Sequence, residues 1–206
     1  MVDWINFAAR KVPVWAIWVL SLLPAPILLY TGATGGLGRE PISALEHELG
    51  QIALQLLIVG LCITPLRRFF GLNLLRFRRA FGLLAFTYLV FHMLVWAMLD
   101  VRSVSQMWTD ILKRPYITVG MVGFLLLLPL AVTSTNKMVQ RLGGTWWRKL
   151  HMLVYPATFL GAVHFVMVQK VWESEPLIYA MIIAGLVALR LPRFWAPSSK
   201  VRPRAG

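Results

Sequence analysis

The chain has 206 residues, of which 58% are hydrophobic and only 14% are charged. This apolar content exceeds that of a soluble globular domain and predicts an integral membrane protein. The formal net charge is +13, but long apolar runs separate the 21 Lys and Arg residues, so they form no soluble basic face and nucleic acid is excluded as a partner.

Six apolar windows of about 20 residues follow one another along the chain, and each is long enough to cross roughly 30 Å of hydrocarbon. They cover residues 12–30, 48–66, 80–99, 116–134, 150–169 and 176–194. The windows leave no room for a linker or a second domain. The sequence therefore predicts an all-α membrane protein, a bundle of about six transmembrane helices in one domain spanning residues 1–206.

The basic residues divide unevenly between the two ends of this predicted bundle. One end collects sixteen of the 21: Arg10, Lys11, Arg67, Arg68, Arg76, Arg78, Arg79, Lys137, Arg141, Arg148, Lys149, Arg190, Arg193, Lys200, Arg202 and Arg204. The other end has five, together with seven of the eight acidic residues. Because cytoplasmic loops are enriched in Lys and Arg, both termini are expected in the cytoplasm.

Three of the four histidines fall inside predicted spans, where an ionisable ring indicates a functional site. His92 lies about twelve residues, or roughly 18 Å, beyond the cytoplasmic start of the third span. His151 opens the fifth span, and His164 follows about 20 Å further along it. His92 and His164 therefore share a depth, and two imidazoles at one depth can bind haem iron from both faces.

The other candidate residues are less well matched. His151 is too far from His164 to bind the same iron, although Pro156 between them is expected to bend or unwind the helix. His151 is a candidate for a second, inner haem, but Arg78 and Arg79 stand where a partner histidine would be needed. These arginines are candidates for contacts with haem propionates or a flavin phosphate. His47, flanked by two glutamates, is interpreted as an interfacial polar residue.

Three segments carry a resemblance to a known family: LGQIALQLLIVGLCITPLRR, RRAFGLLAFTYLVFHMLVWAMLD, and the stretch from KRPYITVG to AVHFVMVQK. Over about residues 41–170 the chain resembles the ferric-reductase-like transmembrane group and, within it, the MsrQ (YedZ) family of haem-binding membrane subunits. The resemblance implies a bacterial inner-membrane protein with haem b and FMN. It implies His92 and His164 as haem ligands, and His151 as a third candidate.

The same resemblance implies partners. Electrons would come from the quinone pool or a cytosolic flavin reductase, and would go to the periplasmic subunit MsrP, which repairs methionine sulfoxide in oxidised proteins. The chain lacks a G-x-G-x-x-G between a strand and a helix and shows no substrate-reducing residue set, so it is interpreted as an electron-transfer subunit. The outer segments 31–47 and 100–115 are the predicted docking region.

Two other functions remain open at this point. A self-contained ferric reductase would need a dehydrogenase domain, which the sequence does not show. A transporter with histidines as proton relays would be favoured by carboxylates within the spans, and the six predicted windows contain none apart from Glu48 at the edge of the second.

Overall fold

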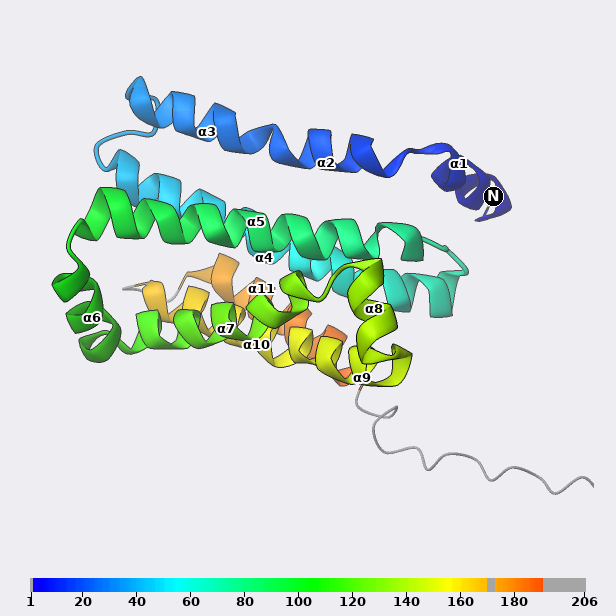
Figure 1. Cartoon of the computed structure of the whole chain (residues 1–206). Helices are drawn as coiled ribbons and strands as arrows, with labels where there is room; N and C mark the ends of the chain where they lie inside the picture. Colours follow the sequence, from blue (N-terminus) through cyan, green and yellow to red (C-terminus); the bar gives the residue numbers. More distant parts are fainter. Residues whose placement is uncertain (1, 170–172, 191–206) are drawn as a thin grey trace, which may run out of the picture.

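The computed structural model describes residues 2–169 and 173–190, and within these ranges the chain folds into helices without any strand (Figure 1). Among the described residues, five segments are long and apolar enough to cross a membrane: 14–33, 41–70, 75–101, 115–132 and 144–168. A sixth apolar helix, α11 (Ser174–Ala188), is shorter, with 15 residues. The predicted all-α membrane bundle is confirmed, and residues 191–194 of the predicted sixth span lie outside the described residues.

The first span is built from two nearly continuous helices, α2 (Val14–Leu22) and α3 (Pro24–Ala33), after a short N-terminal helix α1 (Val2–Lys11). The backbone stays helical through Leu23, whose N–H donates to the carbonyl of Val19, and Pro24 has no N–H to continue this series of bonds, so the two helices are divided there. The hydroxyl of Tyr88 donates to the carbonyl of Ser21 at 2.6 Å. This bond ties the first span to the third.

The second span is longer than its hydropathy predicts. Helix α4 runs over Pro41–Phe70, so it begins seven residues before the predicted start at residue 48. Its first two turns contain Glu46 and His47, which the prediction had left outside the membrane helix. The helix ends at Gly71, whose φ of 70° allows the left-handed conformation of a helix C-cap.

The third and fourth spans are joined by a helix that the sequence analysis had assigned to a loop. After the 3₁₀ turn η1 (Leu75–Phe77), α5 (Arg78–Val95) continues into a π-helical turn, η2 (Trp96–Val101). The joining helix α6 (Val104–Lys113) is amphipathic and too short to span a membrane, so hydropathy alone did not detect it. Helix α7 (Pro115–Val132) forms the fourth span.

The fifth span is interrupted near its start. Two short helices, α8 (Asn136–Leu142) and α9 (Gly144–Leu150), lead into a 3₁₀ turn, η3 (His151–Leu153), and then into α10 (Val154–Val168). Pro156 lies in the first turn of α10 and has no N–H to donate to the carbonyl of Met152. The local unwinding expected from Pro156 is therefore present, at η3.

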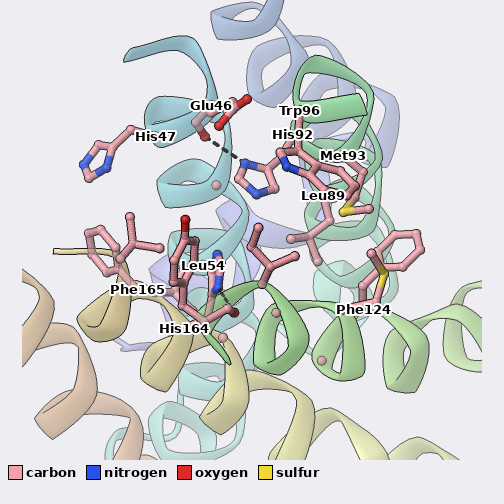
Figure 2. A pocket seen from close by; sticks show the side chains of 18 of the residues that line it. Glu46, His47, Leu54, Leu89, His92, Met93, Trp96, Phe124, His164 and Phe165 are labelled. Carbon is pink, nitrogen blue, oxygen red and sulfur yellow. Dashed lines mark hydrogen bonds between the residues drawn. The ribbon is translucent and has the colours of Figure 1, made fainter. Parts of the chain in front are cut away.

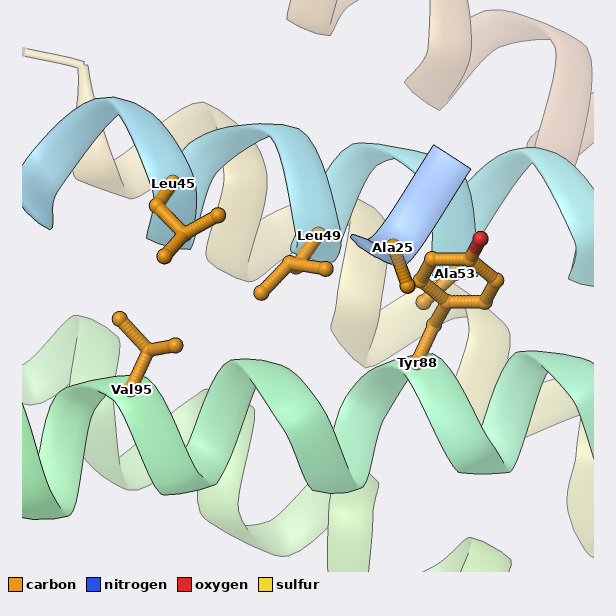
Figure 3. Close-up of a cluster of buried hydrophobic side chains, with 6 residues drawn as sticks. All are labelled: Ala25, Leu45, Leu49, Ala53, Tyr88 and Val95. Atoms are coloured by element: carbon orange, nitrogen blue, oxygen red, sulfur yellow. The ribbon is translucent and has the colours of Figure 1, made fainter. Parts of the chain in front are cut away.

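Helix α4 lies at the centre of the bundle and packs against α3, α5, α10 and α11, while α7 packs along α10. One buried cluster joins α3, α4 and α5 through Ala25, Leu45, Leu49, Ala53, Tyr88 and Val95 (Figure 3). A second joins α4 and α5 to α7 and α10, and a third joins α4 to α10 and α11. The four helices α4, α5, α7 and α10 surround the site described next.

Candidate haem site

A cavity of about 360 Å³ opens between α4, α5, α7 and α10. This volume falls in the range of about 300–1,000 Å³ typical of cofactor sites. Most of its wall is apolar, and Figure 2 shows Leu54, Leu89, Phe124 and Phe165 around it. Gly120, Gly123 and Gly161 also line it, and at each of them a neighbouring helix packs closely against the glycine.

His92 of α5 and His164 of α10 both line this cavity. Figure 2 shows the two rings on either side of the same space, with their ring centroids 6.3 Å apart and their planes at 80° to each other. The structure therefore brings together two histidines that are 72 positions apart in the sequence. Their shared depth was the basis for pairing them in the sequence analysis.

Each of these rings is held by a backbone carbonyl from the neighbouring helix. Nδ1 of His92 lies 2.9 Å from the carbonyl oxygen of Glu46, and Nδ1 of His164 lies 2.7 Å from that of Tyr116. A carbonyl only accepts, so Nδ1 carries the proton in both rings and Nε2 is left with its lone pair. This tautomer is the one that binds a metal through Nε2.

The separation of the rings fits one metal ion between them. Metal–imidazole bonds are about 2 Å long and the nitrogen lies about 1 Å from its ring centre, so two rings on opposite sides of one ion have centres about 6 Å apart. The observed separation of 6.3 Å agrees with this arrangement. Two facing neutral imidazoles and an apolar wall together fit a haem group.

Polar side chains gather at the end of the cavity nearest α6. Glu46, Trp96, Asp100 and Arg114 all line it there. Oε1 of Glu46 and Nε1 of Trp96 are buried and have no hydrogen-bond partner among the described residues. A donor and an acceptor without partners at one end of a cavity can receive a polar group of a ligand.

His47 lies at this end of the cavity, as well as beside a shallow surface hollow lined by Glu40 and Glu48. Its ring lies 5.3 Å from that of Phe165. The interpretation of His47 as an interfacial residue stays a prediction. Glu46 belongs to α4 because this helix begins at Pro41, before the predicted window.

His151 lies apart from this cavity, at the start of the fifth span. Its ring stacks on Trp147 with centroids 3.8 Å apart. Nδ1 of His151 lies 3.0 Å from the carbonyl oxygen of Trp147, and Nε2 lies 3.4 Å from the hydroxyl of Ser134. Both ring nitrogens of His151 therefore have partners within the protein.

Neither predicted arginine contact lines the cavity. Arg79 is exposed, and its Nη1 donates to Oδ1 of Asn136 at 2.8 Å. Arg78 is half-buried at the start of α5, and both guanidinium groups act electrostatically on His151. The two arginines thus belong with His151 at the end of the bundle opposite α6.

The family model described as ferric reductase like transmembrane component matches residues 49–162 of this chain. The protein-methionine-sulfoxide reductase heme-binding subunit MsrQ of Brucella anthropi is 44% identical over 93% of this chain and 88% of its own length. The subunits of the same name from Brucella ovis and Brucella abortus are 46% identical over 92% of this chain and 89% of theirs. The chain belongs to the MsrQ family of ferric-reductase-like transmembrane proteins.

This family membership confirms the resemblance found in the sequence. The matched residues 49–162 include His92 and His151, and His164 lies two positions beyond their end. The MsrQ relatives align over nearly the whole chain. No solved structure matches the chain significantly.

Sequence reasoning missed the residues that orient the histidines. Glu46 and Tyr116 act through their carbonyls, and a carbonyl has no residue-specific signal in a sequence. Gly50 of α4 and Gly120 of α7 each stand four positions after one of these carbonyl residues. That repeated spacing, set against a histidine on each partner helix, was the available signal.

Proposed function

We propose that this chain is a membrane subunit that holds haem b between His92 and His164 and passes electrons across the membrane. The observation that carries the proposal is the pair of facing imidazoles, 6.3 Å apart, each with Nδ1 engaged by a carbonyl. The MsrQ relatives are named heme-binding subunits, which supports the same cofactor.

The residues of the chain have distinct roles in this proposal. His92 and His164 bind the iron through Nε2, while the carbonyls of Glu46 and Tyr116 fix the orientation of the rings. The apolar wall excludes water from the iron. Haem supplies a one-electron couple, which suits an electron carrier that has no substrate-reducing centre of its own.

The proposed electron acceptor is a periplasmic methionine-sulfoxide reductase, MsrP. The relatives are named as subunits of protein-methionine-sulfoxide reductase, which supports an acceptor of this class. The proposed donor is the quinone pool or a cytosolic flavin reductase. FMN enters the proposal through the family resemblance, with Arg78 and Arg79 as candidate phosphate contacts, and His151 remains a third candidate haem ligand.

The proposed location is a bacterial inner membrane, with both termini in the cytoplasm and residues 1–206 forming one domain. The loop between α4 and α5 and the helices α8 and α9 lie at the same end of the bundle as α1 (Figure 1). The Lys and Arg residues of α1, of the α4–α5 loop, and of α8 and α9 therefore lie at one end of the bundle, and α6 lies at the opposite end. The positive-inside rule supports a cytoplasmic location for the basic end.

An absorption spectrum of the purified protein tests the proposed function. A Soret band with α and β bands that sharpen on dithionite reduction, and a pyridine haemochrome of the b type, are expected. Flavin quantitation on the same sample tests FMN. Protein that is monodisperse and free of haem after expression with a haem supply would overturn the proposal, and proton or solute flux in vesicles would then favour a transporter. Reduction of chelated iron by the chain with nicotinamide cofactor alone would favour a ferric reductase.

A further inference from the structure

The two imidazole planes meet at 80°, which is close to perpendicular. Each ring is fixed by two contacts with the neighbouring helix, one at its edge and one at its face. The edge contact is the hydrogen bond from Nδ1 to a carbonyl of Glu46 or Tyr116. The face contact is with a glycine, and it explains why these two positions lack a side chain.

His164 lies over Gly120 of α7. A Cβ atom at Gly120 would stand 2.8 Å from Nδ1 of His164, 3.0 Å from Cε1 and 3.1 Å from Cγ. These distances are shorter than carbon and nitrogen atoms tolerate without bonding. An alanine at this position would therefore force the imidazole ring to rotate or to move away from α7.

His92 lies over Gly50 of α4 in the same way. A Cβ atom at Gly50 would stand 3.3 Å from Nδ1 of His92 and 3.4 Å from Cε1. This contact is tight, but a shift of a few tenths of an ångström would relieve it. The constraint on His92 is thus weaker than the constraint on His164.

The two halves of the site repeat one arrangement. In each, the carbonyl residue and the glycine are four positions apart, at 46 and 50 or at 116 and 120. Residues four apart lie one above the other on a helix, so one ring can cover the glycine and reach the carbonyl one turn away. Glycine inside a helix is less stable than alanine, and the close approach of the histidine ring explains why glycine occupies these two positions.

We propose that Gly50 and Gly120 are positioning residues that hold the two axial imidazoles nearly perpendicular and thereby set the electronic state of the haem iron. This inference rests on the proposed function, because it requires a haem bound by His92 and His164. Each axial imidazole donates π density to the iron d orbital perpendicular to its own plane. Two iron d orbitals can accept this density. Parallel rings act on the same one and separate the two orbitals in energy, whereas perpendicular rings act on one orbital each and leave their energies nearly equal.

Electron paramagnetic resonance of the oxidised protein distinguishes these cases. For the wild-type protein the expected signal is low-spin and strongly anisotropic, with one dominant low-field feature, as a nearly degenerate pair produces. A three-line rhombic low-spin signal in the wild-type protein would overturn the inference while leaving haem binding intact. A wild-type protein that binds no haem would instead overturn the proposed function itself.

Glycine variants test the positioning role. Gly120→Ala is expected to convert the signal towards the rhombic form, or to weaken haem retention by roughly tenfold, as changes to residues that orient metal ligands do. Gly50→Ala is expected to change the signal in the same direction but less. The matched controls are Gly82→Ala in α5 and Gly185→Ala in α11, since an added Cβ meets nothing within 4 Å at either position.

The outcomes separate cleanly. A Gly120→Ala protein with the wild-type signal and haem content would overturn the role of the glycine. Equal changes in Gly82→Ala and Gly120→Ala would also overturn it, because Gly82 touches no histidine. If Gly120→Ala does not fold, the wild-type signal and the Gly50→Ala signal decide the matter.

Discussion

The same side chain occurs in two different settings at the two ends of this bundle. In the cavity between α5 and α10, His92 and His164 each donate a hydrogen bond from one ring nitrogen to a carbonyl, and the other nitrogen has no such partner among the described residues. At the start of the fifth span, His151 has a partner for each nitrogen and a stacked indole against its face.

This difference shows how an imidazole at membrane depth can be interpreted. A ring whose two nitrogens are satisfied by the protein is explained by packing alone, because hydrogen bonds between helices already offset its burial. A ring with one oriented nitrogen and one unused nitrogen facing a cavity is arranged for a ligand. Variants of the residues in each setting test whether the two settings differ in this way.

Removal of either cavity histidine is expected to have the largest effect. His92→Ala or His164→Ala deletes one of two axial ligands, so haem content should fall by at least about tenfold relative to the wild-type protein. The pyridine haemochrome per polypeptide measures this. Wild-type haem content in both variants would mean that the iron is bound elsewhere.

Removal of His151 is expected to affect stability more than the cavity haem. His151→Ala loses the stack on Trp147 and the contacts of both nitrogens, which together contribute about 1–2 kcal/mol. Thermal unfolding in detergent should show this loss, while the low-spin signal of the cavity haem persists. Disappearance of that signal in His151→Ala would contradict the separation of the two settings.

The sequence could predict the bundle and the histidine pair because both follow from lengths along the chain. Apolar windows give the spans, and a rise of about 1.5 Å per residue gives the depth of each histidine within its span. The rotation of each helix about its axis cannot be counted in this way. The carbonyls of Glu46 and Tyr116 became partners of the histidines only when the helices packed in one rotation.

The start of α4 at Pro41, before the predicted window that begins at residue 48, has a separate explanation. Glu46, His47 and Glu48 lower the hydropathy of the first turns, so the predicted window began at residue 48. In the structure these turns belong to a helix that begins at Pro41, a favoured residue for a first helical position. A polar residue that faces a cavity between helices does not face lipid, and hydropathy does not distinguish the two environments.

Replacement of His47 tests how much a third cavity histidine matters. Its ring packs against Phe165 at 5.3 Å, and a contact of this kind contributes about 0.5–1 kcal/mol. His47→Ala should therefore lower thermal stability slightly and retain the haem. Haem loss as large as in His92→Ala would indicate that His47 takes the place of one of the two facing histidines as a ligand of the iron.

Replacement of Arg79 is expected to have the smallest effect on the cavity haem. Arg79 stands thirteen residues before His92 on α5, which corresponds to about 20 Å along the helix. Its guanidinium is exposed and bonded to Asn136, so Arg79→Gln should change stability by less than about 1 kcal/mol. Haem content should equal that of the wild-type protein, whereas bound FMN should fall if this arginine contacts a flavin phosphate. Haem loss in Arg79→Gln would instead contradict the separation of this arginine from the cavity.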